Sequence, residues 1–278
     1  MGYKILEKKS LIPGQTSMLI VSAPHVAAKA RPGNFVILRV DEQGERIPLT
    51  IADVKPEIGA IVLVFLVVGK TTAQLNDLAT GDELQDVCGP LGKPTRIEKL
   101  PGAVVCVGGG TGIAAMHHIA KGHVAAGNHV IAVIGARNKD LLLFCSELSD
   151  FCPEVRIATN DGSQGKQGFV TDVLKDILES GDLISEVVAV GPVPMMEAVA
   201  NMTRPYDICT TVSLNSIMVD GIGMCGACRC NVGGETRFAC VEGPEFDGHL
   251  VDFDALRRRL GQFKEQEKLS YERYKEGK

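Results

Sequence analysis

The segment 219–240, with the sequence VDGIGMCGACRCNVGGETRFAC, constrains the fold of this chain more than any other part of it. Four of the nine cysteines lie between Cys225 and Cys240, in a stretch rich in glycine. Asp220, Cys225, Cys228 and Cys240 follow the spacing D-x4-C-x2-C-x11-C. Because Gly reaches backbone angles that other residues avoid, such a loop can wrap around a compact metal centre. We therefore predict a small metal-binding module near the end of the chain.

The spacing matches the plant-type [2Fe–2S] pattern, C-x4-C-x2-C…C, at three of its four positions and has an aspartate at the first. A carboxylate oxygen is anionic and can bind iron, although it is a harder donor than a thiolate. We expect Asp220, Cys225, Cys228 and Cys240 to be the ligands of a [2Fe–2S] cluster. Two alternatives stay open: Cys230 can replace Asp220, or the four cysteines can bind zinc.

A second motif is the glycine-rich loop in VVCVGGGTGIAAMHHIA, between a predicted strand, Ala103–Val107, and a predicted helix, Thr111–Ala126. A pyrophosphate can approach the backbone amides of such a loop, where the helix dipole favours negative charge. A plain tight turn is the alternative interpretation. The candidate nucleotide-binding residues of this loop are Gly108, Gly109, Gly110, Thr111 and Gly112.

Two later loops also follow predicted strands, and ligands of parallel sheets bind at the carboxyl ends of strands. The three loops are therefore expected to converge on one crevice that binds a nicotinamide nucleotide. The candidate binding residues in the two later loops are Asp161, Gly162, Ser163, Gly191, Pro192 and Met195.

The sequence pattern predicts three folded parts and a charged end. Residues 1–97 contain short strands punctuated by Pro and Gly, which are typical of an antiparallel β-barrel. Residues 98–210 alternate strands with helices, which indicates an α/β domain with a parallel sheet. Residues 211–253 contain the cysteine motif, and residues 254–278 are expected to form a charged helix or tail.

Within these parts the pattern of apolar residues also predicts individual elements. The predicted strands are Met18–Ser22, Asn34–Val40, Ala60–Val68, Val130–Ile134, Val155–Ala158, Val187–Val190 and Val212–Val219. The predicted helices are Thr71–Leu78, Leu141–Leu148, Phe169–Leu178 and Met195–Asn201, and the first of them is expected to begin with a threonine cap.

Composition excludes several classes of protein. The net charge of −5 argues against a surface for nucleic acid. The longest apolar runs are shorter than the ~20 residues that a membrane helix needs. The N-terminal residues show no apolar export signal and the number of cysteines is odd, so we expect a cytoplasmic protein without a disulfide framework.

With these motifs in place, residues 3–253 resemble the ferredoxin–NADP reductase superfamily, which has the same order of barrel, GGGTG nucleotide domain and ferredoxin-like cluster. Within it, the chain is similar to two groups of electron-transfer subunits. They belong to dihydroorotate dehydrogenase B and to NADH-dependent reduced ferredoxin:NADP⁺ oxidoreductase. Asp220 favours the second group, because the dihydroorotate subunits usually have cysteine at that position.

The resemblance implies that FAD binds on the barrel. RIPLT matches the R-P-x-S flavin motif of the family loosely, since its arginine lies one residue too early, and VGKTT looks like the segment that binds the FAD pyrophosphate. The implied flavin-binding residues are Arg46, Pro48, Leu49, Thr50, Gly69, Lys70, Thr71 and Thr72. The chain departs from the family at Ala115, where Pro is frequent, and at Val190, where Cys often lies near the nicotinamide.

Together, these features predict an oxidoreductase subunit in which hydride passes between NAD(H) and FAD, and single electrons pass through the cluster. No acid–base residue is expected. The resemblance implies a larger partner subunit that is a flavoprotein with iron–sulfur clusters. NADP is possible as the nucleotide, because Arg137 could reach a 2′-phosphate. The alternatives are the electron-transfer subunit of dihydroorotate dehydrogenase B and a non-enzymatic assembly subunit stabilised by zinc.

Overall fold

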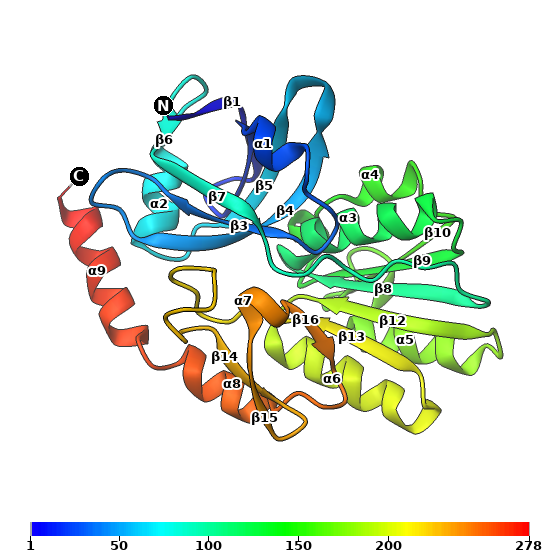
Figure 1. The fold of residues 1–278 in the computed structure, drawn as a ribbon. Coiled ribbons are helices and arrows are strands. Elements are labelled where there is room, and N and C mark those ends of the chain that lie inside the picture. The colour runs from blue at the N-terminus through cyan, green and yellow to red at the C-terminus, as the bar shows by residue number, and fades with distance from the viewer. Residues whose placement is uncertain (1, 278) are drawn as a thin grey trace.

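The computed structural model describes residues 2–277 and contains a β-barrel, a parallel sheet covered by helices and a small cysteine-rich module (Figure 1). The barrel lies beside the parallel sheet, and the module packs below the barrel next to the sheet. This arrangement confirms the predicted fold class of an antiparallel barrel followed by an α/β domain. The limits assigned to the separate parts stay predictions.

The barrel is built from antiparallel strands in the order β6-β1-β2-β5-β4-β3-β7. Alternate side chains of these strands, such as Leu19, Val21, Ile61 and Leu63, fill its interior and are fully buried. The strands are β1 (Tyr3–Ile12), β2 (Thr16–Ser22), β3 (Phe35–Arg39), β4 (Arg46–Lys55), β5 (Ala60–Leu66), β6 (Glu83–Leu84) and β7 (Asp86–Leu91). Its helical segments are α1 (Pro24–Ala27), the 3₁₀ turn η1 (Pro56–Ile58) and α2 (Lys70–Asp77).

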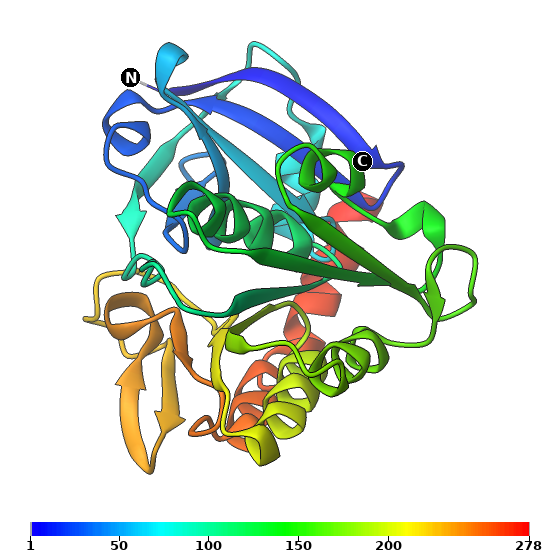
Figure 2. The same ribbon diagram turned by 90° about the vertical axis from the view of Figure 1, so that its right-hand side faces the viewer.

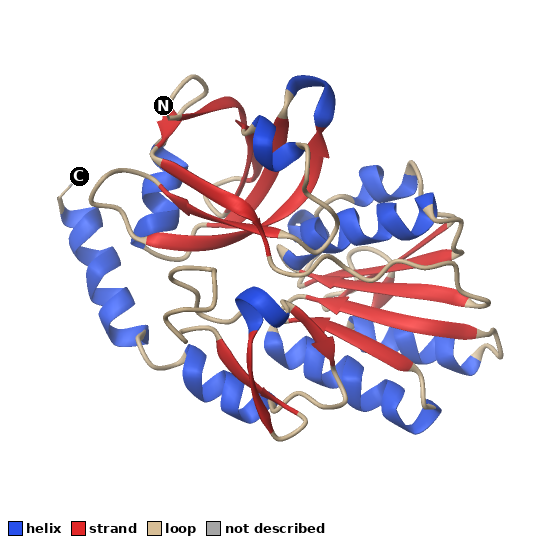
Figure 3. Ribbon diagram, in the orientation of Figure 1, coloured by secondary structure: helices blue, strands red, loops and turns tan. Residues whose placement is uncertain are grey.

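The second sheet has the order β11-β10-β9-β8-β12-β13-β16, and only its edge pair β13–β16 is antiparallel. Its central strands are apolar throughout because helices cover both faces (Figure 3). The strands are β8 (Ala103–Gly109), β9 (Val130–Ala136), β10 (Glu154–Thr159), β11 (Lys166–Gln167), β12 (Ile184–Val190), β13 (Cys209–Ser213) and β16 (Glu245–Asp247).

The helices of this domain divide between the two faces of the sheet. Helices α3 and α4 pack with Cys106 and Val188 on one face, whereas α5 and α6 pack with Val105 and Val187 on the other. The helical segments are α3 (Gly112–Ala125), η2 (Lys139–Leu141), α4 (Cys145–Ser149), α5 (Val170–Glu179), α6 (Val193–Thr203) and η3 (Arg204–Tyr206).

The strand order of the parallel sheet changes direction next to β8. Strand β9 lies on one side of β8 and the much later strand β12 on the other. The loops that follow β8 and β12 therefore diverge onto opposite faces of the sheet and leave a crevice between them. This crevice is where a ligand of such a sheet is expected.

Helix α3 connects the nucleotide domain to the barrel. His118 Nδ1 donates a hydrogen bond to the Ile51 carbonyl of β4 at 2.9 Å, and burial lowers the pKa of this imidazole, so the ring stays neutral. At the edge of the same contact, Lys121 forms an ion pair with Asp53 at 2.8 Å. The loop before α3 is thereby held at a fixed position relative to the barrel.

The cysteine-rich module contains a hairpin that projects from the body of the protein (Figure 2). Its elements are β14 (Arg229–Val232), β15 (Glu235–Phe238) and α7 (Ala239–Glu242), followed by α8 (Phe253–Leu260) and α9 (Lys264–Glu276). Helix α9 returns to the barrel and packs beside α2, where Tyr274 Oη donates to Asp77 at 2.5 Å (Figure 1).

Three predicted elements differ from the structure. The predicted helix Leu141–Leu148 is α-helical only from Cys145, because the 3₁₀ turn η2 ends at Leu141 and Phe144 has a left-handed φ of 57°. The predicted strand Val212–Val219 ends at Ser213, where the chain leaves the sheet. Helix α2 begins after Gly69 rather than at a threonine, and Thr72 Oγ1 accepts from the Gly69 amide at 3.0 Å.

Within residues 2–277, no helix combines the length and the apolar character needed to cross a membrane.

The packing of α5 against the sheet generates a stability prediction. Leu174 is fully buried there, whereas Leu183 is 66% exposed in a nearby loop. We expect Leu174→Ala to lower the free energy of unfolding by about 2–5 kcal/mol, since it leaves a cavity in the core. Leu183→Ala should change it by less than about 0.5 kcal/mol. Chemical denaturation of both variants measures the difference, and equal losses would contradict the packing described.

Candidate functional site

The three parts of the protein meet around a cavity of about 600 Å³. The barrel contributes Phe35 and the segment 48–50, and the nucleotide domain contributes the loops that follow β8 and β12. The segment 213–216 and Met218 close the cavity from the side of the cysteine module. A ligand in this cavity would contact all three parts at once.

A second hollow of about 340 Å³ adjoins the first at the carboxyl ends of the parallel strands. Arg137, Asn160 and Met195 line it. The two hollows share Leu66, the segment 109–111 and Pro192 as lining residues. An extended ligand bound over the sheet can therefore bring one end to a second ligand in the larger cavity.

Glycine is required where the two loops approach each other. A Cβ on Gly112 would lie 2.4 Å from the Val190 carbonyl oxygen, and a Cβ on Gly109 would lie 2.5 Å from Met195 Sδ. Gly110, by contrast, has a φ of 56° and open space beside it. The loop is thus packed on one side and accessible on the other, next to the amino end of α3, where the helix dipole favours a phosphate.

The polar groups of the cavity fit a flavin nucleotide. Ser216 Oγ is buried in its wall, Thr16 Oγ1 is buried in the wall of the adjoining smaller hollow, and neither has a hydrogen-bond partner among the described residues. A buried hydroxyl without a partner is costly, so a ligand group that pairs with it would be favoured. Thr72, in the first turn of α2, also lines the cavity and places a helix amino end there.

The structure brings most of the predicted nucleotide and flavin residues together. Those that line one or both hollows are Pro48, Leu49, Thr50, Thr72, Gly109, Gly110, Thr111, Gly112, Arg137, Gly191, Pro192 and Met195.

The other predicted residues lie outside the two linings. Thr71 is buried and donates to Glu45 at 2.9 Å, and Gly108 lies beneath Ile113 and Met116. The remaining ones are on the surface or in turns, namely Arg46, Gly69, Lys70, Asp161, Gly162 and Ser163.

Sequence reasoning missed an entire wall of the larger cavity. Ser213, Asn215, Ser216 and Met218 line it, although the sequence pattern placed them in a strand. The polar residues Asn215 and Ser216 interrupt the apolar alternation and were the available signal. Phe169 of the smaller hollow was also missed, since its sequence neighbourhood predicts only a helix start.

Three of the predicted cluster ligands, Asp220, Cys225 and Cys228, lie on the loop before β14, and Cys240 lies in α7 after the hairpin. Cys228 Sγ and Cys240 Sγ are 3.1 Å apart and buried. Asp220 accepts from the Cys225 amide at 2.6 Å and from the Ile222 amide at 3.0 Å. In the described part of the chain, no group of three metal-binding side chains is fully assembled. Cys225 is exposed and Asp220 partly so, and the two amides hold both carboxylate oxygens of Asp220.

The backbone around these sulfurs suits an anionic centre. The Ala227 amide lies 3.5 Å from Cys225 Sγ. The Cys240 amide lies 3.5 Å from Cys228 Sγ. Gly221 and Gly226 have left-handed φ angles of 74° and 66° that turn the loop. Backbone amides directed at sulfur and glycine turns of this kind fit an iron–sulfur cluster better than a plain loop.

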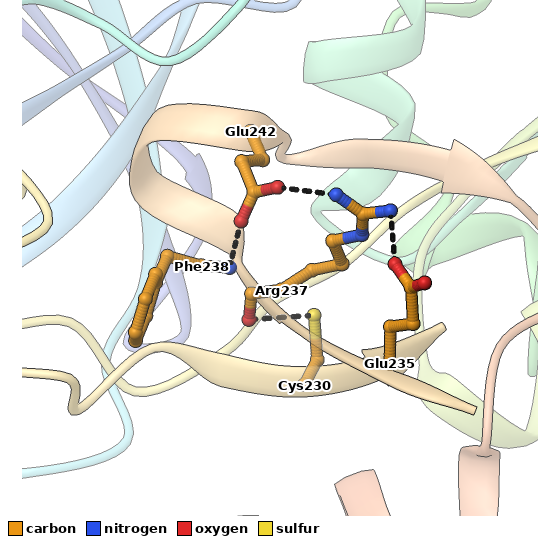
Figure 4. Close-up of polar contacts among 5 residues, drawn as sticks. All are labelled: Cys230, Glu235, Arg237, Phe238 and Glu242. Atoms are coloured by element: carbon orange, nitrogen blue, oxygen red, sulfur yellow. Dashed lines mark hydrogen bonds and ion pairs between the residues drawn. The ribbon is translucent and has the colours of Figure 1, made fainter. Parts of the chain in front are cut away.

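Cys230 occupies a different environment from the other cysteines of the motif. Its thiol is directed at the Arg237 carbonyl across the hairpin, at 3.6 Å, as Figure 4 shows. Arg237 also bonds Glu242 and Glu235, and Glu242 accepts from the Phe238 amide (Figure 4). The polar contacts around Cys230 therefore form a structural unit of the hairpin.

The Asp220 carboxyl and the thiols of Cys230 and Cys240 also differ in the direction in which their surroundings shift the pKa. Amide hydrogen bonds, from Ile222 first and Cys225 next, lower the pKa of Asp220, which is an anion at neutral pH. Burial raises the pKa of Cys230 to about 11. Burial and the hydrogen bond with Cys228 raise the pKa of Cys240 to about 12, so binding of a metal there would release a proton.

The close packing of the glycine loops generates a binding prediction. Gly112→Ala places a methyl group against the Val190 carbonyl, so the loop must shift. We expect the Kd for the nicotinamide nucleotide to rise at least tenfold, which corresponds to a loss of about 1.4 kcal/mol of binding free energy. Gly261→Ala, at the end of α8, meets only ordinary contacts and is the control. Titration calorimetry measures both, and unchanged binding by Gly112→Ala would contradict the crevice as the nucleotide site.

Comparison with known proteins agrees with this geometry. Residues 106–201 match the oxidoreductase NAD-binding domain family, and residues 215–252 match the iron–sulfur cluster binding domain of dihydroorotate dehydrogenase B. A relative from Thermotoga maritima, described as a dihydroorotate dehydrogenase B (NAD⁺) electron transfer subunit homolog, is 49% identical over 91% of this chain and 89% of its own.

Solved structures extend the comparison. A chain in the structure of NADH-dependent reduced ferredoxin-NADP oxidoreductase, which concerns flavin-based electron bifurcation, has 45% identity and a TM-score of 0.93. The match covers 99% of this chain and 98% of that one. A ferredoxin NADP⁺ reductase from Neisseria gonorrhoeae with bound FAD and NADP shares the fold, with a TM-score of 0.60 and 14% identity over 74% of this chain and 91% of that one.

These findings confirm the predicted resemblance, the nicotinamide domain and the iron–sulfur domain. The chain belongs to the family of flavin-linked oxidoreductase electron-transfer subunits that includes the dihydroorotate dehydrogenase B subunits.

Proposed function

We propose that this chain is the smaller subunit of an NADH-linked oxidoreductase similar to the NADH-dependent reduced ferredoxin-NADP oxidoreductase. When bound, FAD would accept a hydride from the nicotinamide, and the [2Fe–2S] cluster would carry single electrons. The observation that carries the proposal is the single cavity at which the barrel, the glycine loops and the cysteine module meet.

The residues of the cavity have distinct proposed roles. Thr50, on β4, would contact the reactive edge of the flavin, and the amino end of α2 at Gly69–Thr72 would hold its pyrophosphate. The loop 108–112 would bind the pyrophosphate of the nicotinamide nucleotide at α3. None of these residues transfers a proton, and their task is to position two ring systems and exclude water.

The nucleotide is proposed to be NAD(H) rather than NADP(H). Arg137 lines the smaller hollow at a place where a 2′-phosphate could be reached. The backbone amide of Asp161 donates to the Arg137 carbonyl at 3.2 Å, which places Asp161 beside Arg137. Hydrogen bonds from Ser163 lower the pKa of the Asp161 carboxyl, so a negative charge persists beside this end of the crevice. A carboxylate there favours a ribose hydroxyl and repels a phosphate.

The proposed cluster ligands are Asp220, Cys225, Cys228 and Cys240. Support comes from the contact between the sulfurs of Cys228 and Cys240 and from the ionised state of Asp220. Cys230 is the weaker candidate because the hairpin already holds its thiol.

A partner subunit is proposed to cover the surface around Cys225. Exposed apolar side chains gather along this loop and on α7, where Met224 is 81% exposed, Ile222 53% and Val241 40%. Exposed apolar residues concentrated beside a redox loop indicate an interaction surface. The proposed partner is a larger flavoprotein subunit with iron–sulfur clusters.

The proposed location is the cytoplasm. Within residues 2–277 all nine cysteines are free thiols, and disulfides are rare in that compartment.

The electron-transfer subunit of dihydroorotate dehydrogenase B is the second candidate function. The name of the Thermotoga maritima relative favours it. The match to the NADH-dependent reduced ferredoxin-NADP oxidoreductase chain is more complete, because it covers 99% of this chain, against 91% for the Thermotoga maritima relative. We therefore place that function first.

The proposal predicts a coloured protein that NADH reduces. Anaerobically purified protein should show flavin absorption with a reddish-brown [2Fe–2S] shoulder, and NADH should bleach the flavin. NADPH at the same concentration should act at least tenfold more slowly, which corresponds to about 1.4 kcal/mol of discrimination. Stopped-flow absorbance measures both rates. Colourless protein that contains zinc would instead support a non-enzymatic assembly subunit.

The ligand assignment predicts opposite results for two substitutions. Asp220→Cys should keep the cluster but change its potential and its electron paramagnetic resonance spectrum, because thiolate is a softer donor than carboxylate. Cys230→Ser should keep the cluster with an unchanged potential and an unchanged spectrum, since the Cys230 thiol is not a ligand of the cluster. Loss of iron in Cys230→Ser, together with an unchanged spectrum in Asp220→Ala, would contradict the assignment.

A further inference from the structure

Two arginines from different elements reach the backbone of the cluster loop. Arg229, at the start of β14, donates through Nη1 to the Gly226 carbonyl at 3.0 Å. Arg259, on α8, donates through Nη2 to the Ala227 carbonyl at 2.9 Å. The two acceptors belong to consecutive peptide groups between Cys225 and Cys228.

Arg229 contacts the Gly226 carbonyl twice, through its guanidinium and through its backbone amide at 3.3 Å, and so helps to orient the other end of the same peptide group. The Gly226 carbonyl shares its peptide plane with the Ala227 amide, which lies 3.5 Å from Cys225 Sγ. The left-handed φ of Gly226, 66°, permits this orientation. When an arginine holds the carbonyl end outward, the amide end stays directed at the sulfur.

The charges of both arginines are uncompensated. Among the ion pairs of residues 2–277, none includes Arg229 or Arg259, whereas Arg257 on the same helix pairs with Glu197 and Asp254. Burial and the nearby charge of Arg229 lower the pKa of Arg259, and both guanidiniums donate to carbonyls of adjacent residues. A guanidinium nevertheless keeps its charge at neutral pH. Two positive charges therefore lie next to the proposed cluster without a carboxylate to neutralise them.

We propose that Arg229 and Arg259 are positioning residues that raise the reduction potential of the cluster. The inference rests on the proposed function. Reduction adds negative charge to the cluster, so nearby positive charge stabilises the reduced state and raises the potential. Amides fixed toward sulfur act in the same direction. The two arginines would thus make the cluster a better acceptor of electrons from the flavin.

Redox titration of the full-length holoprotein, followed by electron paramagnetic resonance, tests the inference. Arg229→Gln and Arg259→Gln should each move the midpoint potential to more negative values, and the double variant should move it further. Arg258→Gln is the matched control, because Arg258 is exposed on the same helix, and it should keep the wild-type potential. Arg259→Lys, which retains the charge, should lie closer to the wild type than Arg259→Gln.

Wild-type potentials in both glutamine variants at full iron content would overturn the inference, as would equal shifts in Arg259→Lys and Arg259→Gln. If the glutamine variants lose iron, the Arg229→Lys and Arg259→Lys variants decide. If the two lysine variants retain iron and have a near wild-type potential, the role of charge is supported. If the lysine variants also lose iron, the role of charge is contradicted. A wild-type protein without any [2Fe–2S] signal would instead refute the proposed function itself.

Discussion

The close approach of two backbone turns at the centre of the parallel sheet is the contact on which the rest of this structure depends. Gly112 lies so near the Val190 carbonyl that no side chain fits between them. This contact places the amino end of α3 at the mouth of the crevice, while His118 of the same helix bonds β4 of the barrel. One rigid helix therefore sets the distance between the nucleotide loop and the flavin cavity.

The cysteine module is attached to the same framework from the other side. Strand β13 pairs with β12 and also with β16, the strand that follows α7, so the cysteine loop begins close to the carboxyl end of the central sheet. Gly221 packs against Ile37 and Leu91 of the barrel so closely that a Cβ there would lie 2.7 Å from both. The loop thus rests on the barrel beside the cavity wall, and its exposed face is available to a partner.

The sequence predicted the features whose spacing is local. The GGGTG loop and the cysteine motif each lie within one short segment, so residue type and spacing alone indicate phosphate binding and metal binding. The cavity wall at 213–216 was missed, because its only local signal is the polar pair Asn215 and Ser216, and the end of a strand depends on what packs beside it. The contact of Arg259 with Ala227 joins residues that are distant in sequence, and only the folded chain brings them together.

The central claim is that the flavin cavity lies between the nicotinamide crevice and the cluster, so that electrons must pass through the flavin. Rapid freezing of protein mixed anaerobically with NADH, in FAD-containing and FAD-depleted forms of equal iron content, tests it most directly. The account predicts that the electron paramagnetic resonance signal of the reduced [2Fe–2S] cluster develops only when FAD is bound. A signal that develops equally fast without FAD would contradict it.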